Sequence, residues 1–373
     1  MKLGIVISTY DRRGGLERVA VEYARGLCAL GHDVTVYAQS VEREPADEGI
    51  RFARVGGFKG NIAARAATFP VKATHALDGS SLDNIVAFGS VLRRPAVVRL
   101  PGAHRSWWEF ANAAWPASTW DGLRRRMNPH HRLILSWDHR VLGRGIPKRV
   151  LAAGRWAAED IARFYPAVAN KVSILPDGVN LEEFRFVEGA RDQWEKRFGS
   201  GPLLLTVATE LRRKGLDAMF ESFRLVRDAA PNAQLIVGGR VPAGDVRALA
   251  VQHKVQDAVH AVGFIGDLSE AYSAADVLVF PTLFDPWGLP IVEALACGLP
   301  VAASARAGAS EVLQDGVSGV SVKDPTNPRA VADAVVRALG ITPDRDALRA
   351  SVAHLSWDNV VRDLEHVLEQ TKG

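Results

Sequence analysis

The sequence predicts an α/β protein made of two successive doubly wound, Rossmann-like domains. Its 373 residues suit two domains of ordinary size better than one hydrophobic core. Short apolar runs alternate with helical segments, as expected of parallel strands joined by helices. This alternation starts again after residue 170, so we expect domains at 1–170 and 171–355, with a hinge at 176–178.

The first domain opens with the apolar run 3–8, the turn Gly14-Gly15 and a helix at 16–30. That helix places five apolar side chains on one face: Leu16, Val19, Ala20, Tyr23 and Leu27. Further strands are expected at 33–39, 50–55, 84–89, 96–102 and 148–154. In the second domain, strands are expected at 203–208, 234–239, 259–264, 277–281, 300–305 and 319–322.

The final stretch, 356–373, predicts an amphipathic helix that is free to pack back on the N-terminal domain. Its apolar face contains Trp357, Val360, Val361, Leu364, Val367 and Leu368.

The composition favours a cytoplasmic protein with no disulfide framework. Cys28 and Cys297 are the only cysteines, which also disfavours a zinc site. The N-terminus predicts no signal peptide, and no stretch reaches the roughly 20 apolar residues of a spanning helix. Residues 1–170 carry 25 Lys/Arg and 15 Asp/Glu, whereas 171–373 carry 21 and 27. A basic first half favours peripheral contact with an anionic membrane or with a phosphorylated acceptor. The alternative is that these charges only keep the surface solvated. No nucleic-acid partner is expected.

Three segments follow strands, where open α/β sheets bind ligands. Gly14-Gly15 precedes a helix and forms either an anion site or a plain tight turn. The segment 208–215 carries Arg212, Arg213 and Lys214, which suit a diphosphate or a solvated loop. The dinucleotide fingerprint GxGxxG is absent, which disfavours a dehydrogenase, and so is the P-loop pattern GxxxxGK[ST].

The third segment, 284–301, places two carboxylates eight residues apart around a glycine. Asp285 and Glu293 flank Gly288, where a helix is expected to begin. The backbone N–H groups of Gly288 and Leu289 would then face a ligand, although acidic residues near a helix start are also ordinary caps.

These motifs resemble the retaining glycosyltransferases of the GT-B fold, family four, over almost the whole chain. The similarity rests on GGLERVAVEYARGLCALGHDVTVYAQ, VSILPDGVNLEEF, RRKG, LSEAYSAADVLVFPTLFDPWGLPIVEALACGLPVAAS and SEVLQDGVSG. The opening block is most similar to lipopolysaccharide-core glucosyltransferases. The resemblance implies two domains facing across a cleft. It also implies transfer of a hexose from a nucleotide-diphosphate sugar, UDP being favoured, to a glycan, glycolipid or lipopolysaccharide-type acceptor.

The resemblance also implies a role for each matching residue. Lys214, Arg213, Asp285 and His104 would be catalytic, Lys214 on the diphosphate, Asp285 on sugar hydroxyls and His104 beside the reacting sugar. A structural role remains the alternative for His104. Glu293 would bind the ribose. The other donor-binding candidates are Gly14, Gly15, Arg212, Phe264, Trp287, Gly288 and Leu289.

Two departures from the family pattern affect the donor site. Thr209 stands where the family usually has an arginine, so Arg212 or Arg213 would supply that charge. Asp285 replaces a glutamate and is shorter by one methylene, which puts the donor sugar in question.

We expect retention by front-face transfer, with no cofactor and no metal. The only DxD sequence, Asp344-Arg345-Asp346, is expected to begin a helix instead of holding a metal. Two alternatives remain: a GT-B nucleotide-sugar epimerase and a non-catalytic sugar-nucleotide-binding module.

Acceptor recognition is expected in the segment 104–132 of the first half. Arg105, Trp107 and Trp108 are the leading candidates, and Arg124, Arg125 and Arg126 would meet phosphate. Trp115 and Trp120 would stack on sugars or enter a membrane interface, unless the tryptophans are simply packed under a basic helix.

Overall fold

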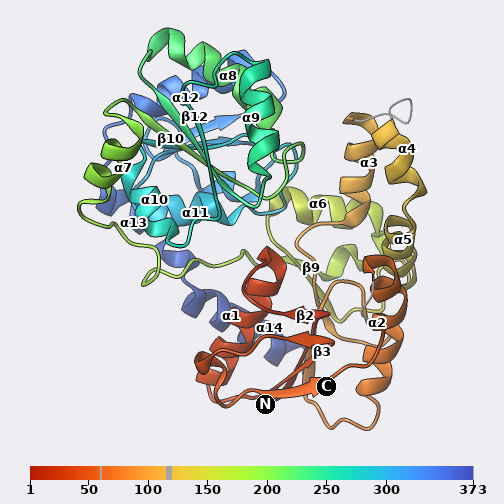
Figure 1. Cartoon of the computed structure of the whole chain (residues 1–373). Helices are drawn as coiled ribbons and strands as arrows, with labels where there is room; N and C mark the ends of the chain where they lie inside the picture. The colour runs from red at the N-terminus through yellow and green to blue at the C-terminus, as the bar shows by residue number, and fades with distance from the viewer. Residues whose placement is uncertain (59–60, 115–119, 373) are drawn as a thin grey trace. The chain divides into compact units, whose positions relative to one another are not determined.

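The computed structural model describes residues 1–58, 61–114 and 120–372, which form two compact units (Figure 1). The first unit comprises Met1–Asp177 and Trp357–Gly373, and the second comprises Gly178–Ser356. The boundary therefore lies at residue 177 instead of 170. The reason is β9 (Val172–Ile174), which sequence patterns did not separate from the hinge and which pairs with β8 (Arg149–Ala152) of the first sheet.

The first unit is built on a seven-stranded parallel sheet in the order β5-β3-β1-β6-β7-β8-β9. Its remaining strands are β1 (Lys2–Val6), β3 (Asp33–Ala38), β5 (Arg51–Arg54), β6 (Asn84–Phe88) and β7 (Val97–Arg99). Its helices are α1 (Gly15–Ala29), α2 (Ile62–Ala76), α3 (His104–Ala114), α4 (Trp120–Met127), α5 (Pro129–Val141), α6 (Arg155–Phe164) and α14 (Trp357–Gln370). A two-stranded pair, β2 (Thr9–Tyr10) with β4 (Ser40–Val41), was not predicted.

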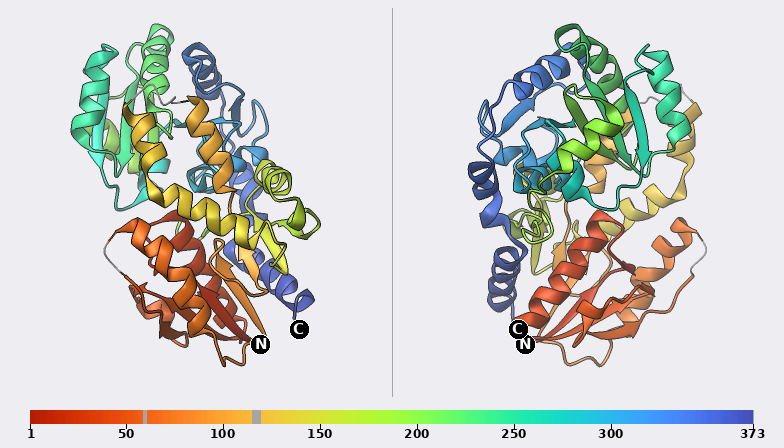
Figure 2. Two further views of the ribbon diagram at one scale, coloured as in Figure 1. Left: turned by 90° about the vertical axis from the view of Figure 1, so that its right-hand side faces the viewer. Right: turned by 60° about the vertical axis from the view of Figure 1, so that its left-hand side comes forward.

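The last helix, α14, belongs to the first unit and lies against α1 (Figures 1 and 2). Four side chains of its predicted apolar face besides Trp357 are buried: Val360, Val361, Leu364 and Leu368. The contact is close, because a Cβ on Gly26 of α1 would lie 2.6 Å from Val361 Cγ2. Lys2 and Lys372 lie near the two ends of the chain and both contact Asp83, at 2.7 Å from the Lys2 N–H and 3.6 Å from the Lys372 ammonium (Figure 2).

The second unit has a six-stranded parallel sheet in the order β12-β11-β10-β13-β14-β15. Its strands are β10 (Leu203–Ala208), β11 (Gln234–Gly239), β12 (Val259–Gly263), β13 (Val277–Phe280), β14 (Val301–Ser304) and β15 (Gly319–Val322). Its helices are α7 (Ala190–Phe198), α8 (Leu216–Ala229), α9 (Ala243–Gln252), α10 (Leu268–Ala274), α11 (Leu289–Ala296), α12 (Pro328–Leu339) and α13 (Arg345–Val352).

Both sheets are doubly wound, which confirms the predicted fold class. In the second unit the strand order reverses between β10 and β13, and ligands of such sheets bind outside the carboxyl ends at the reversal. Within the described ranges, no helix combines the length and the apolar character needed to cross a membrane.

Candidate active site

The predicted basic segment lies directly after β10, in the turn 211–215 that precedes α8. The three cations therefore lie in this turn, before the helix begins at Leu216. Gly215 has φ of +70°, and a Cβ there would lie 2.1 Å from the carbonyl oxygen of Pro281. The Thr282 hydroxyl and the Leu283 N–H both donate to the Arg213 carbonyl, at 3.0 and 2.8 Å. The turn is thus fixed against the carboxyl end of β13.

This arrangement brings Lys214 and Asp285 together. Lys214 Nζ lies 2.5 Å from Asp285 Oδ2, and both side chains are largely buried. Arg213 Nη1 approaches the same oxygen at 3.9 Å and donates to the Phe284 carbonyl at 3.2 Å. Burial disfavours the charged carboxylate, but Lys214 and Arg213 outweigh it and hold the pKa of Asp285 below its usual value. The Asp285 carboxyl is therefore ionised at neutral pH, with Lys214 in contact and Arg213 as the nearby arginine.

The segment after β13 is also held in place by backbone contacts. Asp285 N–H donates to the Arg306 carbonyl at 3.1 Å, and Gly308 N–H donates to the Asp285 carbonyl at 3.1 Å. Gly288 is the N-cap of α11, so the helix begins where the sequence predicted, and its φ of +97° is a left-handed conformation that favours glycine. Because the first N–H groups of a helix have no intrahelical acceptor, the amides of Gly288 and Leu289 can bind an anion or a hydroxyl.

Glu293 occupies a different environment from Asp285. It lies inside α11, is 3% exposed, and accepts a hydrogen bond of 3.0 Å from the Tyr272 hydroxyl. Sequence analysis missed Tyr272, because a tyrosine within an apolar helix gives no sign of its distant partner.

The two aromatic candidates differ sharply in exposure. Phe264, just after β12, is 76% exposed, so its ring face is open to a ligand. Trp287 is 4% exposed, and within the described part of the chain its indole Nε1 has no hydrogen-bond partner. The Trp287 ring is therefore enclosed by protein. A sugar-nucleotide donor would contact the neighbouring backbone amides of Gly288 and Leu289 instead of the ring.

A second missed feature lies at the end of β11. Gly239 has φ of +112°, and a Cβ there would lie 2.0 Å from the Ala208 carbonyl oxygen at the end of β10. Arg240 follows, and its N–H donates to that carbonyl at 3.0 Å. In the sequence, the pair Gly238-Gly239 followed by Arg240 could have predicted a further cation at the carboxyl edge of this sheet.

In the first unit, Gly14 and Gly15 start α1 as expected but differ in access. The Glu17 carboxylate folds against Gly14, where a Cβ would lie 2.0 Å from Glu17 Oε2, whereas Gly15 is exposed to open space. Burial raises the pKa of Glu17. The expected anion site thus already holds a carboxyl group on its Gly14 side.

His104 is the first residue of α3 and is paired with another histidine. Its Nε2 lies 3.1 Å from His131 Nδ1 of α5, and the two rings are stacked. Burial, followed by the repulsion of His131 and His130, lowers the pKa of His104 to about 4. His104 is therefore neutral at physiological pH. Sequence analysis missed His131.

The predicted acceptor segment is spread over three helices. Arg105 Nε pairs with Glu109 Oε1 at 3.0 Å, and Trp108 contacts the His131 ring. Trp107 is half-buried and contacts Phe110. Trp115 lies outside the described residues. Trp120, on α4 with Arg124, Arg125 and Arg126, is 77% exposed.

Among the described residues, the acidic side chains do not gather as metal ligands do. Across residues 1–58, 61–114 and 120–372, no three His, Cys, Asp or Glu side chains form a group able to hold a metal ion. Asp344 of the DxD sequence instead caps α13, its carboxylate accepting from Ala347 N–H at 3.0 Å.

Known proteins share this sequence pattern and fold. Residues 13–183 match the family "Glycosyltransferase Family 4", and residues 190–353 match "Glycosyl transferases group 1". Lipopolysaccharide glucosyltransferase WaaG of Escherichia coli K12 is 24% identical over 95% of this chain and 94% of its own. A crystal structure of WaaG superposes with a TM-score of 0.79 at 22% identity, covering 98% of this chain and 99% of the other. Anabaena Alr3699/HepE, solved in complex with UDP and glucose, has a TM-score of 0.72 at 15% identity over 99% and 100% of the two chains.

Proposed function

Because the chain belongs to the GT-B glycosyltransferases, with a family 4 N-terminal part and a group 1 C-terminal part, we propose that it uses a UDP-hexose. The hexose is transferred with retention, without a metal, to a glycan, glycolipid or lipopolysaccharide-type acceptor. The UDP complex of Alr3699/HepE supports the choice of nucleotide, and the similarity to WaaG supports the acceptor class.

The observation that carries this proposal is the Lys214–Asp285 pair at the β10/β13 reversal. A nucleotide diphosphate gains negative charge as the glycosidic bond breaks, and fixed cations stabilise it. We assign this role to Lys214 and Arg213, aided by the amides of Gly288 and Leu289. When Lys214 binds the diphosphate, its ion pair with Asp285 breaks, and the Asp285 carboxylate can accept hydrogen bonds from the sugar hydroxyls.

We assign the proton transfer to the substrates themselves. In this mechanism the acceptor hydroxyl attacks the face from which the diphosphate departs, and its proton passes to a departing phosphate oxygen. Lys214 and Arg213 keep that phosphate in place, while Glu293 holds the ribose. His104, which is neutral, contacts the reacting sugar as a hydrogen-bonding group and not as a cation.

A Lys214→Ala variant tests the proposal. We expect turnover of UDP-glucose or another accepted UDP-hexose to fall about a hundredfold or more, because a preorganised cation is lost from the transition state. Lys196→Ala, an exposed lysine on α7, is the matched control and should keep full turnover. Normal turnover in Lys214→Ala would remove Lys214 from the mechanism.

Two further measurements separate the parts of the proposal. NMR analysis of the product should show the anomeric configuration of the donor, and an inverted product would refute front-face transfer. Turnover should be unchanged after exhaustive chelation with EDTA, whereas loss of turnover restored by a divalent cation would refute metal independence.

We also propose that the enzyme works in the cytoplasm at the inner face of the membrane. On α4, Trp120, Leu123 and Met127 are exposed beside three arginines, a combination that favours an anionic lipid surface. Sedimentation with vesicles containing phosphatidylglycerol should carry the protein down at low salt and release it at high salt. Sedimentation that is equal with neutral vesicles would contradict this.

A further inference from the structure

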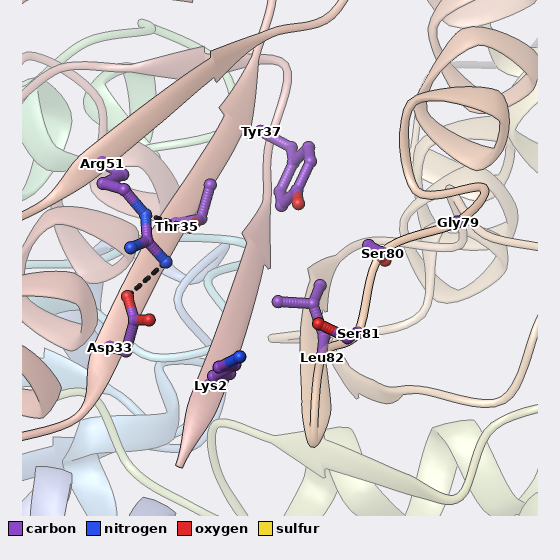
Figure 3. Close-up of a pocket in the computed structure, with 9 residues that line it drawn as sticks. All are labelled: Lys2, Asp33, Thr35, Tyr37, Arg51, Gly79, Ser80, Ser81 and Leu82. Atoms are coloured by element: carbon purple, nitrogen blue, oxygen red, sulfur yellow. Dashed lines mark hydrogen bonds and ion pairs between the residues drawn. The ribbon is translucent and has the colours of Figure 1, made fainter.

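A polar cavity of 450 Å³ lies in the first unit at the amino ends of β1, β3 and β5 (Figure 3). Lys2, Asp33, Thr35, Tyr37 and Arg51 form its wall on the sheet, and residues 79–82 form the opposite wall. Gly14, Gly15 and His104 follow the carboxyl ends of β1 and β7, so this cavity is at the other end of the same sheet.

The cavity arises from the way this face of the sheet is covered. Gly4 pairs with Thr35, and Thr35 pairs with Arg51, so these positions face the same side. Further along the strands, α2 covers this side with Phe69 and Ala73. At Gly4, Leu82 takes the place of a side chain, since a Cβ there would lie 2.7 Å from Leu82 Cδ1. The amino ends beyond Leu82 remain open.

Of the side chains that line the cavity, Lys2 and Arg51 are cations and Asp33 is the one anion, so one cation is in excess. Arg51 forms an ion pair with Asp33, and its Nε donates to Thr35 Oγ1 at 3.3 Å. Lys2 is held through its backbone N–H, which donates to Asp83 Oδ2 at 2.7 Å. Among the described residues, nothing forms a hydrogen bond or ion pair with the Lys2 ammonium. The cavity is therefore suited to an anion.

Tyr37 supplies a hydroxyl to the same cavity. The residue is 8% exposed, and its hydroxyl points into the cavity (Figure 3). No described residue forms a hydrogen bond with it. Burial raises the pKa of Tyr37, so the hydroxyl keeps its proton. Although most of the Tyr37 side chain is buried, its hydroxyl reaches the open space of the cavity and can donate a hydrogen bond to a ligand.

We propose that this cavity binds a small phosphorylated polyol of the size of a monosaccharide phosphate. Lys2 and Arg51 bind its phosphate, while the hydroxyls of Tyr37 and Thr35 bind its own hydroxyls. The volume lies within the range of small-molecule sites and exceeds what a lone phosphate would fill. The site is separate from the proposed donor site, and its binding is measured without turnover.

The test is isothermal titration calorimetry of the full chain with glucose 6-phosphate, in the presence of saturating UDP. We expect one saturable site, with binding at least about tenfold weaker for glucose or inorganic phosphate alone. Lys2→Met should weaken binding about tenfold or more, and Tyr37→Phe several-fold. Lys72→Met, an exposed lysine on α2 outside the cavity, is the matched control and should bind normally.

Two outcomes would overturn the proposal. One is the absence of saturable binding, and the other is binding that survives Lys2→Met and Tyr37→Phe but disappears in Lys214→Ala, which would place the ligand in the donor site. Thermal unfolding of each variant shows whether it folds. If Lys2→Met does not fold, Tyr37→Phe still tests the proposal, because it keeps the aromatic ring and removes only the hydroxyl.

Discussion

At the scale of single residues, the site depends on a short carboxylate held by a lysine. Asp285 has one methylene less than the glutamate of the family pattern, yet it contacts Lys214 and accepts the Trp287 N–H at 3.3 Å. These contacts restrain its position close to its own backbone. The short Asp285 side chain therefore limits how far its carboxylate can extend toward the donor sugar.

Lengthening this side chain should change donor preference. We expect Asp285→Glu to shift the ratio of kcat/KM between UDP-glucose and UDP-galactose about tenfold, because the carboxylate would meet different hydroxyls. Steady-state kinetics with both donors measures the ratio. Asp257→Glu, at an exposed ion pair with Arg227, is the control, and an unaltered ratio in Asp285→Glu would contradict the assignment.

The depressed pKa of His104 makes the stability of the first unit depend on pH. The group titrates near 6.5 when unfolded and near 4 when folded, so the unfolded chain binds more protons between these values. Its contribution to the free energy of unfolding therefore rises with pH across this window and is constant above it. Between about pH 5 and pH 7.5 the change is about 2 kcal/mol.

Urea unfolding of the protein and of His104→Gln at these two pH values measures this contribution. We expect the variant to lose the corresponding part of the pH dependence. Equal pH dependence in both proteins would show that His104 titrates normally in the folded state.

At the scale of elements, the turn 211–215 shows how a backbone requirement positions a catalytic side chain. Gly215 adopts a left-handed conformation in contact with Pro281, and Lys214 immediately precedes it. The position of Lys214 relative to β13 therefore depends on the absence of a side chain at the next residue.

Gly215→Ala should weaken both the fold and the activity. We expect a loss of roughly 1–3 kcal/mol in the free energy of unfolding, from strain and from the contact with the Pro281 carbonyl, together with reduced turnover. Gly244→Ala is the matched control: its Cβ would meet nothing within 4 Å, and it lies in α9, so stability should be equal or slightly higher. Chemical denaturation measures the free energy of unfolding of both variants, and steady-state kinetics measures their turnover. Equal values for Gly215→Ala and the unaltered protein would contradict this role of Gly215.

At the scale of the whole molecule, the chain leaves the first unit and returns to it. The first unit carries 28 Lys/Arg and 20 Asp/Glu, and the second carries 18 and 22, so the positive charge is concentrated in the unit proposed to meet the acceptor. The returning helix α14 completes the core of that first unit.

Truncation of a single α14 side chain should therefore destabilise a unit whose other part, Met1–Asp177, precedes the whole second unit in the sequence. Leu364 is fully buried, and Leu364→Ala should lower the free energy of unfolding by about 2–5 kcal/mol. Glu369→Ala, exposed on the same helix, should change it little. Differential scanning calorimetry measures the change. If Leu364→Ala shifted no unfolding transition, the assignment of α14 to the core of the first unit would be wrong.

The sequence by itself determined the doubly wound class, most strands and helices, and the location of the main motifs. Periodicity and turn residues act over a few neighbouring positions, so the helix at 16–30 and the helix start at Gly288 were predictable. The motif around Asp285 and the cations at 212–214 are likewise local runs of chain.

Only the tertiary structure decided which distant residues meet. It paired His104 with His131, Glu293 with Tyr272 and Lys214 with Asp285, assigned β9 to the first sheet, and left a cavity where Leu82 covers Gly4. Such contacts depend on strand order and on packing between segments far apart in the chain, and no local pattern of residues encodes them.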